Sequence, residues 1–286
     1  MTARVVVRRF RAGDIPFAHE LRALARWNQT EHDWRGYLKF EPDGCFIAEV
    51  DGRPAGTATT IRYGDAFGWI GMVLVHPGRR RQGIGSELLR RAIAYLRESG
   101  VRCVKLDATP MGRPVYRPLG FLDEYELFRY EGPAPAGCAA VPGGVAPLTV
   151  ADVGAIAPFD ATVFGAERGH VLAELSARNP ELCFVAPAAG GPRGYVIARV
   201  GAGAIQVGPW IARDPVTAEQ LLLALFERVG GRTVFIDVLA PNGAGVELLK
   251  KHGLRVQRTL TRMYLGENTA PGRPELIYSI SGAEKG

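Results

Sequence analysis

Apolar and polar residues alternate through the first half of the chain in a pattern that predicts strands separated by helices. Short apolar or alternating segments predict strands at residues 5–10, 45–50, 55–63, 67–75, 103–108 and 127–130. A stripe at helical spacing predicts a long helix, formed by Ile84, Leu88, Leu89, Ala92, Ile93 and Leu96. We expect Asp14 to cap an earlier helix and Gly100 to end the long one. This succession predicts an α/β fold with its ligand where strand ends diverge.

The second half repeats this order. Residues 148–153 parallel residues 10–15 as an entry from a strand into a helix. Strands are predicted at 182–186, 194–200, 204–211 and 234–239, and a helix at 217–229 with Thr217 and Gln220 as a capping box. Residues 132–147, rich in Pro, Gly and Ala, predict a linker. We therefore expect domains at 1–131 and 148–286, joined by that linker.

Composition limits the class of protein. A chain of 286 residues suits two domains, and 47% apolar residues can bury a sizeable core. No apolar run approaches the ~20 residues that span a bilayer, and the opening residues do not resemble a signal peptide. Four cysteines lack the spacing of metal ligands, namely Cys45, Cys103, Cys138 and Cys183. We expect a cytoplasmic protein without a metal or a membrane partner.

The net charge is +6. Nucleic-acid binding is one interpretation of this excess, but the arginines are dispersed and aromatic residues do not alternate with them as a base-stacking surface requires. We therefore expect no nucleic-acid partner. Attraction of a polyanionic cofactor is the better use of local positive charge. The sequence leaves open whether the protein forms a homo-oligomer.

One turn combines glycines with arginines between the strand at 67–75 and the long helix. It contains Arg80 and Arg81, followed by Gly83 and Gly85. Glycine lets a backbone approach an anion closely and adopts positive φ, while the N–H groups of an opening helical turn point at phosphate oxygens. A Walker loop would need Gly-Lys-Ser/Thr, and a dinucleotide fingerprint would need a third glycine where Leu88 stands. The alternative is a basic surface turn before an ordinary helix.

A second motif follows the strand at 103–108, in a segment where we expect a short helix at residues 114–119. Residues 116–121 read Tyr-Arg-Pro-Leu-Gly-Phe. Together with Arg80-x-x-Gly83-x-Gly85, this order resembles the GNAT-type acyltransferases over residues 4–130. The resemblance implies a mixed central sheet of GNAT type. One departure is Thr109-Pro110, where many members of the family carry Asn.

The resemblance also implies the chemistry, which is transfer of an acyl group, most often acetyl, from coenzyme A to a primary amine. The amine would attack directly in a ternary complex, and a strand N–H would polarise the thioester carbonyl. Tyr116 would donate a hydrogen bond or a proton to the leaving sulfur; its alternative is a packing role in the core. Acetyl-CoA would contact Val73, Leu74, Val75, Arg80, Arg81, Gln82, Gly83, Ile84, Gly85 and Ser86.

The acceptor is expected at the loop after the first helix. Glu31, His32 and Asp33 are general-base candidates there, with solvated loop residues as the alternative. Tryptophan rings attract alkyl ammonium groups, and a pocket lined by rings and amides suits a small amine. Trp27, Asn28, Gln29 and Trp34 could therefore line such a pocket, or the two rings could cap the core. In the second half, Asp160, Phe164, Arg168 and Trp210 could face the same cleft or could only support the fold, and Asp160 is the first choice for pairing with a cationic substrate.

The second half lacks both motifs. The loop at 212–216 has no glycine and contains an acidic residue, and Leu249 stands where the alignment places Tyr116. We therefore expect two GNAT-type folds in tandem, of which only the first is active. The predicted function is N-acetylation of a small-molecule amine. The alternatives are a protein or peptide N-acetyltransferase and a non-catalytic acyl-CoA sensor.

Overall fold

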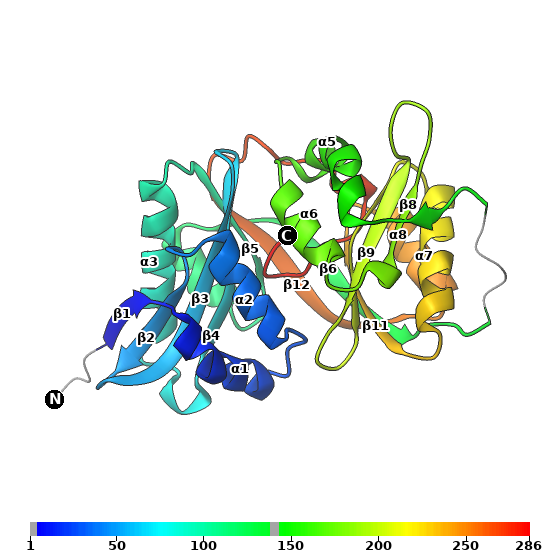
Figure 1. The fold of residues 1–286 in the computed structure, drawn as a ribbon. Coiled ribbons are helices and arrows are strands. Elements are labelled where there is room, and N and C mark those ends of the chain that lie inside the picture. Colours follow the sequence, from blue (N-terminus) through cyan, green and yellow to red (C-terminus); the bar gives the residue numbers. More distant parts are fainter. Residues whose placement is uncertain (1–4, 138–142) are drawn as a thin grey trace. The chain divides into compact units, whose positions relative to one another are not determined.

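The computed structural model describes residues 5–137 and 143–286, which form two compact units (Figure 1). Unit 1 runs to Leu122 and also contains Met263–Thr269 and Lys285. Unit 2 contains Asp123–Arg262, Ala270–Glu284 and Gly286. These limits differ from the domains expected at 1–131 and 148–286. Residues 123–131 belong to unit 2, and Met263–Thr269 and Lys285 belong to unit 1.

Unit 1 has a mixed sheet with the strand order β1-β2-β3-β4-β5, followed by the end of β12. Its strands pair antiparallel except for β4 and β5, which are parallel. The elements are β1 (Val5–Arg9), α1 (Ile15–Leu24), α2 (Glu31–Phe40), β2 (Phe46–Val50), β3 (Arg53–Tyr63), β4 (Phe67–Val75), α3 (Ile84–Glu98), β5 (Cys103–Ala108) and α4 (Arg113–Tyr116). The α/β class predicted from the pattern is confirmed.

Helix α3 covers one face of the sheet of unit 1. Its buried residues are the predicted stripe, Ile84, Leu88, Leu89, Ala92, Ile93 and Leu96. They join one hydrophobic cluster with Ala58, Ile70 and Leu106 of the strands. Gly100 follows the helix with φ +87°, as expected of a residue that ends a helix in the left-handed conformation.

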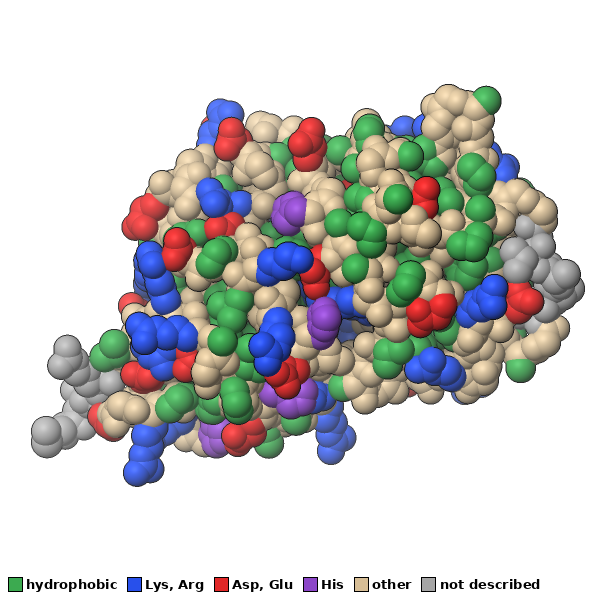
Figure 2. All heavy atoms as spheres, viewed as in Figure 1, with side chains coloured by type: hydrophobic (Ala, Val, Ile, Leu, Met, Phe, Trp, Pro, Cys, Tyr) green, Lys and Arg blue, Asp and Glu red, His purple; other side chains and the backbone are tan. Residues whose placement is uncertain are grey.

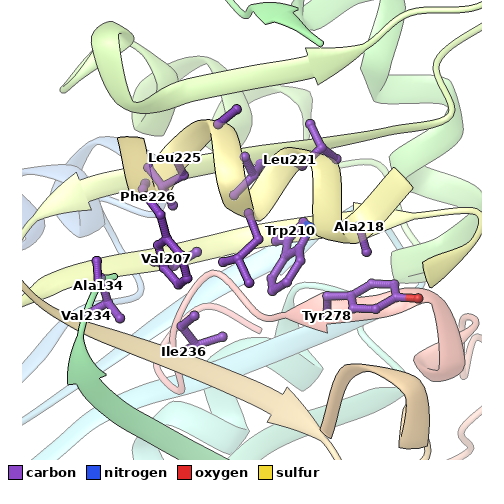
Figure 3. Close-up of a cluster of buried hydrophobic side chains, with 14 of the residues drawn as sticks. Ala134, Val207, Trp210, Ala218, Leu221, Leu225, Phe226, Val234, Ile236 and Tyr278 are labelled. Atoms are coloured by element: carbon purple, nitrogen blue, oxygen red, sulfur yellow. The ribbon is translucent and has the colours of Figure 1, made fainter. Parts of the chain in front are cut away.

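Unit 2 has the strand order β12-β6-β11-β10-β9-β8-β7, and β13 pairs with β10. Its elements are β6 (Leu122–Pro133), β7 (Ala146–Pro147), α5 (Val153–Phe164), α6 (Gly169–Ser176), β8 (Cys183–Ala186), β9 (Gly194–Val200), β10 (Ile205–Ala212), α7 (Pro215–Val229), β11 (Thr233–Leu239), α8 (Gly243–Lys251), β12 (Arg255–Gly266) and β13 (Ile277–Ser279). Helix α7 packs over the sheet, and Leu221, Leu225 and Phe226 point from it toward the strands (Figure 3).

The two units enter their first helices through the same local structure. Asp14 accepts the backbone N–H of Arg11 at 2.8 Å, and Asp152 accepts that of Thr149 at the same distance. Each carboxylate closes a 3₁₀ turn just before the α-helix. Asp14 therefore precedes α1, but its side chain does not cap that helix as predicted. The predicted similarity between residues 10–15 and 148–153 is therefore present as the same turn in both units.

Three other local predictions are wrong in detail. Helix α7 begins two residues earlier than expected, because Asp214 accepts the Thr217 N–H at 2.8 Å and Pro215 occupies the first helical position. Thr217 and Gln220 therefore do not form the capping box. The helix predicted at residues 114–119 is one α-helical turn followed by a 3₁₀ turn at Arg117–Leu119. Strand β3 begins before Pro54 rather than after it.

The segment expected as a linker at 132–147 is partly strand. Strand β6 continues to Pro133, and the Ala134 N–H donates to the Arg232 carbonyl at 2.8 Å. Residues 146–147 form β7. Residues 138–142, which include Cys138, lie outside the described residues.

Lys and Arg side chains are interspersed with Asp and Glu on the face of the molecule in Figure 2 rather than gathered in one patch. Among the described helices, none is long and apolar enough to cross a membrane. In the same described residues, no group of three or more His, Cys, Asp or Glu side chains is arranged to hold a metal ion.

Candidate active site

The turn between β4 and α3 has an unusual backbone. Arg81 has φ +61° and Gly83 has φ +77°, so two left-handed residues stand two positions apart. Such conformations direct successive N–H groups into one concavity that binds anions. A Cβ on Gly83 would meet no atom within 4 Å, so glycine is required here by the backbone conformation and not by packing.

Six consecutive backbone N–H groups in this turn have no hydrogen-bond partner among the described residues, those of Arg81 to Ser86. The first intrahelical bond of α3 is donated by Glu87 to the Gly83 carbonyl, at 3.1 Å. The residue before the helix supplies no side-chain cap either. Unpaired donors at the positive end of a helix dipole form an anion site. We call Arg81–Ser86 the open turn.

Gly85 differs from what the sequence analysis expected. It lies inside α3 and is absent from the described residues with positive φ, so it does not supply a left-handed conformation. A Cβ there would lie 3.6 Å from a methyl group of Val75, which is ordinary contact. Gly85 therefore keeps the first helical turn bare beside the end of β4. Arg80 folds back on that strand, where its Nε donates to the Val75 carbonyl at 3.3 Å.

Next to the open turn, strand β4 presents backbone groups that no described neighbouring strand pairs, although the Val75 carbonyl accepts the bond from Arg80. It pairs with β5 only at Gly68 and Trp69, and the two strands diverge beyond that point. Met72, with φ +49°, forms a bulge at which the register with β3 shifts, and its carbonyl accepts the Thr57 hydroxyl at 2.9 Å. After the bulge, Leu74 is paired to β3.

The His76 N–H donates to the Ala55 carbonyl of β3 at 2.9 Å. In an antiparallel pair every second residue bonds to the partner strand, so Leu74 also bonds to β3, whereas the backbone groups of Val73 and Val75 point away from it. An extended amide-containing ligand can therefore pair with β4 in place of a further strand. Of the three predicted contacts on this strand, the backbones of Val73 and Val75 are therefore accessible to such a ligand, whereas the Leu74 backbone faces β3.

Tyr116 lies at the end of α4 and is 9% exposed. Its ring packs 6.0 Å from that of Phe121, between centroids, within the cluster that α3 covers. Its hydroxyl has no hydrogen-bond partner among the described residues. Burial raises the pKa of Tyr116 to about 12. Proton transfer to a thiolate of pKa about 8.5 is then uphill by about 5 kcal/mol, so a hydrogen bond to the sulfur is the chemistry this residue suits.

Of the acceptor candidates that follow α1, Trp27 lies in the loop, whereas Asp33 and Trp34 lie in α2. Trp27 is half-buried. The ring of Trp34 is fully buried, stacked on Phe10 at 5.6 Å, so it is a core residue and its assignment to the acceptor pocket is wrong. Asp33 caps α2 by accepting the Thr30 N–H at 2.8 Å and also pairs with Lys285 at 3.1 Å. A carboxylate with these partners is not available as a general base.

The remaining candidates lie in the loop or in the first turn of α2, and they differ in exposure. Asn28 and Gln29 are buried. Glu31 is exposed and pairs with Arg35 at 2.6 Å, one helical turn away, and His32 is exposed. The structure thus leaves the general base unassigned to any of the three residues expected from the sequence.

Asp160 is not a substrate site, contrary to expectation. It is fully buried in unit 2, where Arg168 binds it through two hydrogen bonds of 2.9 Å and Tyr195 donates a third. Arg168 also lies 3.7 Å from the centre of the Phe164 ring. A carboxylate neutralised in this way has no free charge for a cationic substrate. Trp210 is likewise a core residue, and it lies beside Tyr278 (Figure 3).

Strand β13 occupies in unit 2 the place that is open in unit 1. Strands β10 and β11 are parallel at Ile205–Val207, and β10 has a register shift directly after Val207. Beyond the shift, β13 pairs with Trp210 and Ile211. The Ser279 hydroxyl of β13 accepts the Asp237 N–H of β11 at 3.0 Å, so β13 lies between the two strands. The gap between strands is therefore filled by the chain itself.

Sequence reasoning missed β13, the bulge at Met72 and the left-handed Arg81. Residues 277–279 read Ile-Tyr-Ser, which is too short a run to stand out as a strand. Bulges and left-handed non-glycine residues have no local signature, because tertiary contacts impose them. The one available signal was the absence of glycine at residues 212–216, which indicated that the second turn is built differently.

Comparisons with known proteins agree with this geometry. The acetyltransferase (GNAT) family model matches residues 15–121, and an acetyltransferase (GNAT) domain model matches residues 156–279. A holothin acyltransferase from Pseudoalteromonas sp. (strain SANK 73390) is 26% identical over 262 residues, which are 91% of this chain and 87% of that protein. The chain belongs to the GNAT acyltransferase family and contains two GNAT domains in tandem.

Solved structures share the fold. The crystal structure of a putative acetyltransferase from Pyrococcus horikoshii superposes with a TM-score of 0.83 at 24% identity, over 99% of this chain and 96% of that one. A tandem GNAT protein from the clavulanic acid biosynthesis pathway, solved without AcCoA, gives a TM-score of 0.63 at 16% identity, over 92% of this chain and 98% of that one. The tandem arrangement predicted from the sequence is confirmed.

Proposed function

We propose that unit 1 transfers an acetyl group from acetyl-CoA to the primary amine of a small molecule, and that unit 2 has no coenzyme site. The observation that carries this proposal is the open turn, with six consecutive unpaired N–H groups at the start of α3. A pyrophosphate needs such a cluster of donors, and few other ligands do. The arrangement of β4 supports the same ligand, because the groups at Val73 and Val75 can pair with an extended chain of amides.

The residues of unit 1 divide the chemistry among them. The open turn would bind the pyrophosphate, and β4 would hold the pantetheine arm and polarise the thioester carbonyl through a backbone N–H. Tyr116 would donate a hydrogen bond to the sulfur as the amine attacks. Because burial raises the pKa of Tyr116 to about 12, the hydroxyl stays protonated while an amine of lower pKa loses its proton.

A small-molecule acceptor is favoured over a peptide by one relative and by the loop after α1. That relative, which aligns with 91% of this chain, is named a holothin acyltransferase. Trp27, half-buried in that loop, offers an aromatic face to an alkyl or aryl amine. The acyl-CoA sensor is disfavoured, since binding alone does not require the unpartnered hydroxyl of Tyr116 at the site.

The test begins with calorimetric titration of the full chain with acetyl-CoA, which requires no guess about the acceptor. We expect one site per chain. Two sites would contradict the assignment of unit 2, and the absence of binding would remove the coenzyme-dependent function. An acceptor panel follows, containing holothin, aliphatic and aromatic amines, and short peptides with a free amino terminus. Release of free thiol with a peptide and with no small amine would favour the peptide acetyltransferase instead.

A further inference from the structure

A row of polar side chains crosses the sheet of unit 2 on the face opposite its hydrophobic core. Five neighbouring strands contribute one residue each, in the order β12, β6, β11, β10 and β9. The members are Arg258, Arg129, Asp237, Gln206 and Arg199, which we call the arginine row. Asp237 lies directly opposite Arg129, and Arg199 directly opposite Gln206. The residues that alternate with them along β6, β9, β10 and β11 belong to the core cluster.

The centre of the arginine row is balanced in charge. Arg129 binds both oxygens of Asp237, at 2.7 and 2.6 Å, and the Gln206 amide donates to Asp237 at 3.0 Å. Burial alone would raise the pKa of the Asp237 carboxyl, but the Arg129 guanidinium outweighs it and holds that pKa below its usual range. Asp237 is therefore a carboxylate whose charge Arg129 compensates.

One end of the row is balanced as well. Arg199 lies 3.5 Å from the buried carboxylate of Glu284. It also donates hydrogen bonds to the carbonyls of Gly208 at 3.2 Å and Ser281 at 2.8 Å. Arg199 and Glu284 thus form a second pair in which each charge has a partner.

Arg258, at the other end, has no such partner. The residue is half-buried, its Nε is wholly buried, and none of its nitrogens donates a hydrogen bond to another described residue. Burial and then the neighbouring Arg129 lower the pKa of Arg258 to about 10, and they outweigh the carboxylates of Asp237 and Glu284, which raise it. A buried guanidinium donor without an acceptor destabilises the fold, since its hydration is lost and not replaced. The row therefore carries one uncompensated positive charge.

We propose that the arginine row binds a small oxyanion, a carboxylate or phosphate group, at Arg258. Such a group accepts the forked donors of a guanidinium and supplies the missing negative charge beside Arg129. The proposal concerns unit 2 alone and does not depend on acetyl transfer in unit 1. The competing explanation is that Arg258 only extends its outer nitrogens into water.

The first test measures binding of inorganic phosphate and of succinate to the full chain by calorimetry, at constant ionic strength. Arg258→Met keeps the length and packing of the side chain and removes its donors. Arg255→Met, on the exposed opposite side of β12, is the matched control. We expect Arg258→Met to weaken binding at least about tenfold, the loss of a hydrogen bond to a charged group, while Arg255→Met leaves it unchanged. The probe that binds more tightly shows whether the site prefers a phosphate or a carboxylate group.

The open turn also binds anions, so each titration is repeated with saturating coenzyme A. A phosphate signal that coenzyme A abolishes belongs to the open turn and not to Arg258. The proposal is overturned if phosphate and succinate bind equally to the wild type and to Arg258→Met, or if neither binds to the wild type. Anomalous diffraction with selenate at Arg258, without binding in solution, would mean an adventitious ion only and would also overturn it.

Thermal unfolding separates a binding role from a structural one. A residue kept for a ligand at a cost in stability gives a variant that is at least as stable when no ligand is present. We therefore expect Arg258→Met to unfold at the same or a higher temperature than the wild type in anion-free buffer, and to lose the stabilisation that the anion gives. A lower melting temperature together with unchanged anion binding would establish the structural role and contradict the proposal.

Discussion

The long helices α3 and α7 begin in opposite ways, although each follows the strand at which its sheet opens. In unit 1, the open turn leaves six N–H groups unpaired and contains two left-handed residues. In unit 2, Asp214 accepts the Thr217 N–H at 2.8 Å and the Thr217 hydroxyl at 2.8 Å, and Pro215 contributes no N–H. No side chain caps the first turn of α3, whereas the Asp214 carboxylate caps that of α7. A helix amino terminus is thus an anion site only where the chain does not cap it.

The strands show the same contrast. Beyond Trp69, β4 has no partner on the side of β5, whereas β10 beyond its register shift pairs with β13. Tyr116 in unit 1 presents a hydroxyl, and Leu249 in unit 2 is a fully buried core residue. Three features of the proposed coenzyme site in unit 1 therefore have no counterpart in unit 2, where a helix cap, a strand and a core leucine stand in their places. The comparison shows that the same fold can leave this region open or fill it with its own chain.

The largest expected effect is on catalysis by Tyr116→Phe. The variant keeps the ring and removes the donor, so we expect kcat to fall about 10- to 100-fold, the value of one hydrogen bond to a charged group. The affinity for acetyl-CoA should stay within about twofold. Tyr95→Phe is the control, because it removes a partly buried hydroxyl from α3 that donates to Glu41 instead. Equal turnover of Tyr116→Phe and wild type across the acceptor panel would disprove the assignment.

The second prediction concerns the strand that fills unit 2. Ser279→Ala removes the acceptor of the Asp237 N–H and the donor to the Val207 carbonyl, 2.7 Å away. Because both groups are buried, we expect the free energy of unfolding to fall by about 1–3 kcal/mol, measured in urea. Ser99→Ala, which removes one half-buried bond to Tyr95, should cost less. A similar loss from both variants would show that β13 adds no stability through this bond.

The third prediction separates backbone strain from ligand binding at the two ends of α3. Gly83 and Gly100 both have positive φ, and a Cβ on either meets no atom within 4 Å. Alanine at each position should lower the free energy of unfolding by about 1–2 kcal/mol. Only Gly83→Ala should also weaken acetyl-CoA binding, because it alters the open turn. If Gly100→Ala weakens binding to the same extent, the effect is a general loss of stability.

The fourth prediction opens the capped helix of unit 2. Asp214→Ala should lower the free energy of unfolding by about 1 kcal/mol, the usual value of a helix cap. Asp214→Asn retains an oxygen acceptor and should cost much less. Neither variant should gain a second acetyl-CoA site in calorimetry, since β13 still occupies the gap beside β10. A second site in Asp214→Ala would mean that the cap alone prevents binding.

The smallest expected effect concerns the pH profile of kcat, whose shape Tyr116→Phe should leave unchanged. Burial raises the pKa of Tyr116 to about 12, so its donating form persists as the pH rises. Between pH 6 and 10 we expect kcat to rise with deprotonation of the amine and to show no falling limb from Tyr116. Wild type and Tyr116→Phe should therefore have profiles of the same shape. A falling limb near pH 9 that the variant lacks would show that the hydroxyl ionises in that range.

The sequence by itself determined the fold class and the tandem arrangement, and it located the turn to which we assign the coenzyme. These features depend on local periodicity and on short motifs, such as the buried stripe of α3 and the residues from Arg80 to Gly85. The same local signals located Tyr116, because the motif fixes its spacing from Gly120-Phe121. Such patterns can be read from the sequence because they depend on residues close together in the chain and not on distant contacts.

Only the tertiary structure decided which polar residues are available for chemistry. Asp33, Trp34 and Asp160 are plausible site residues in sequence, but packing and ion pairs with distant residues make them structural. Strand β13 lies about 70 residues from its partner in β10, and Arg129 binds Asp237 while Arg258 donates no hydrogen bond to another described residue. Whether a donor or a charge is free depends on contacts between segments far apart in the chain, and local sequence does not encode those contacts.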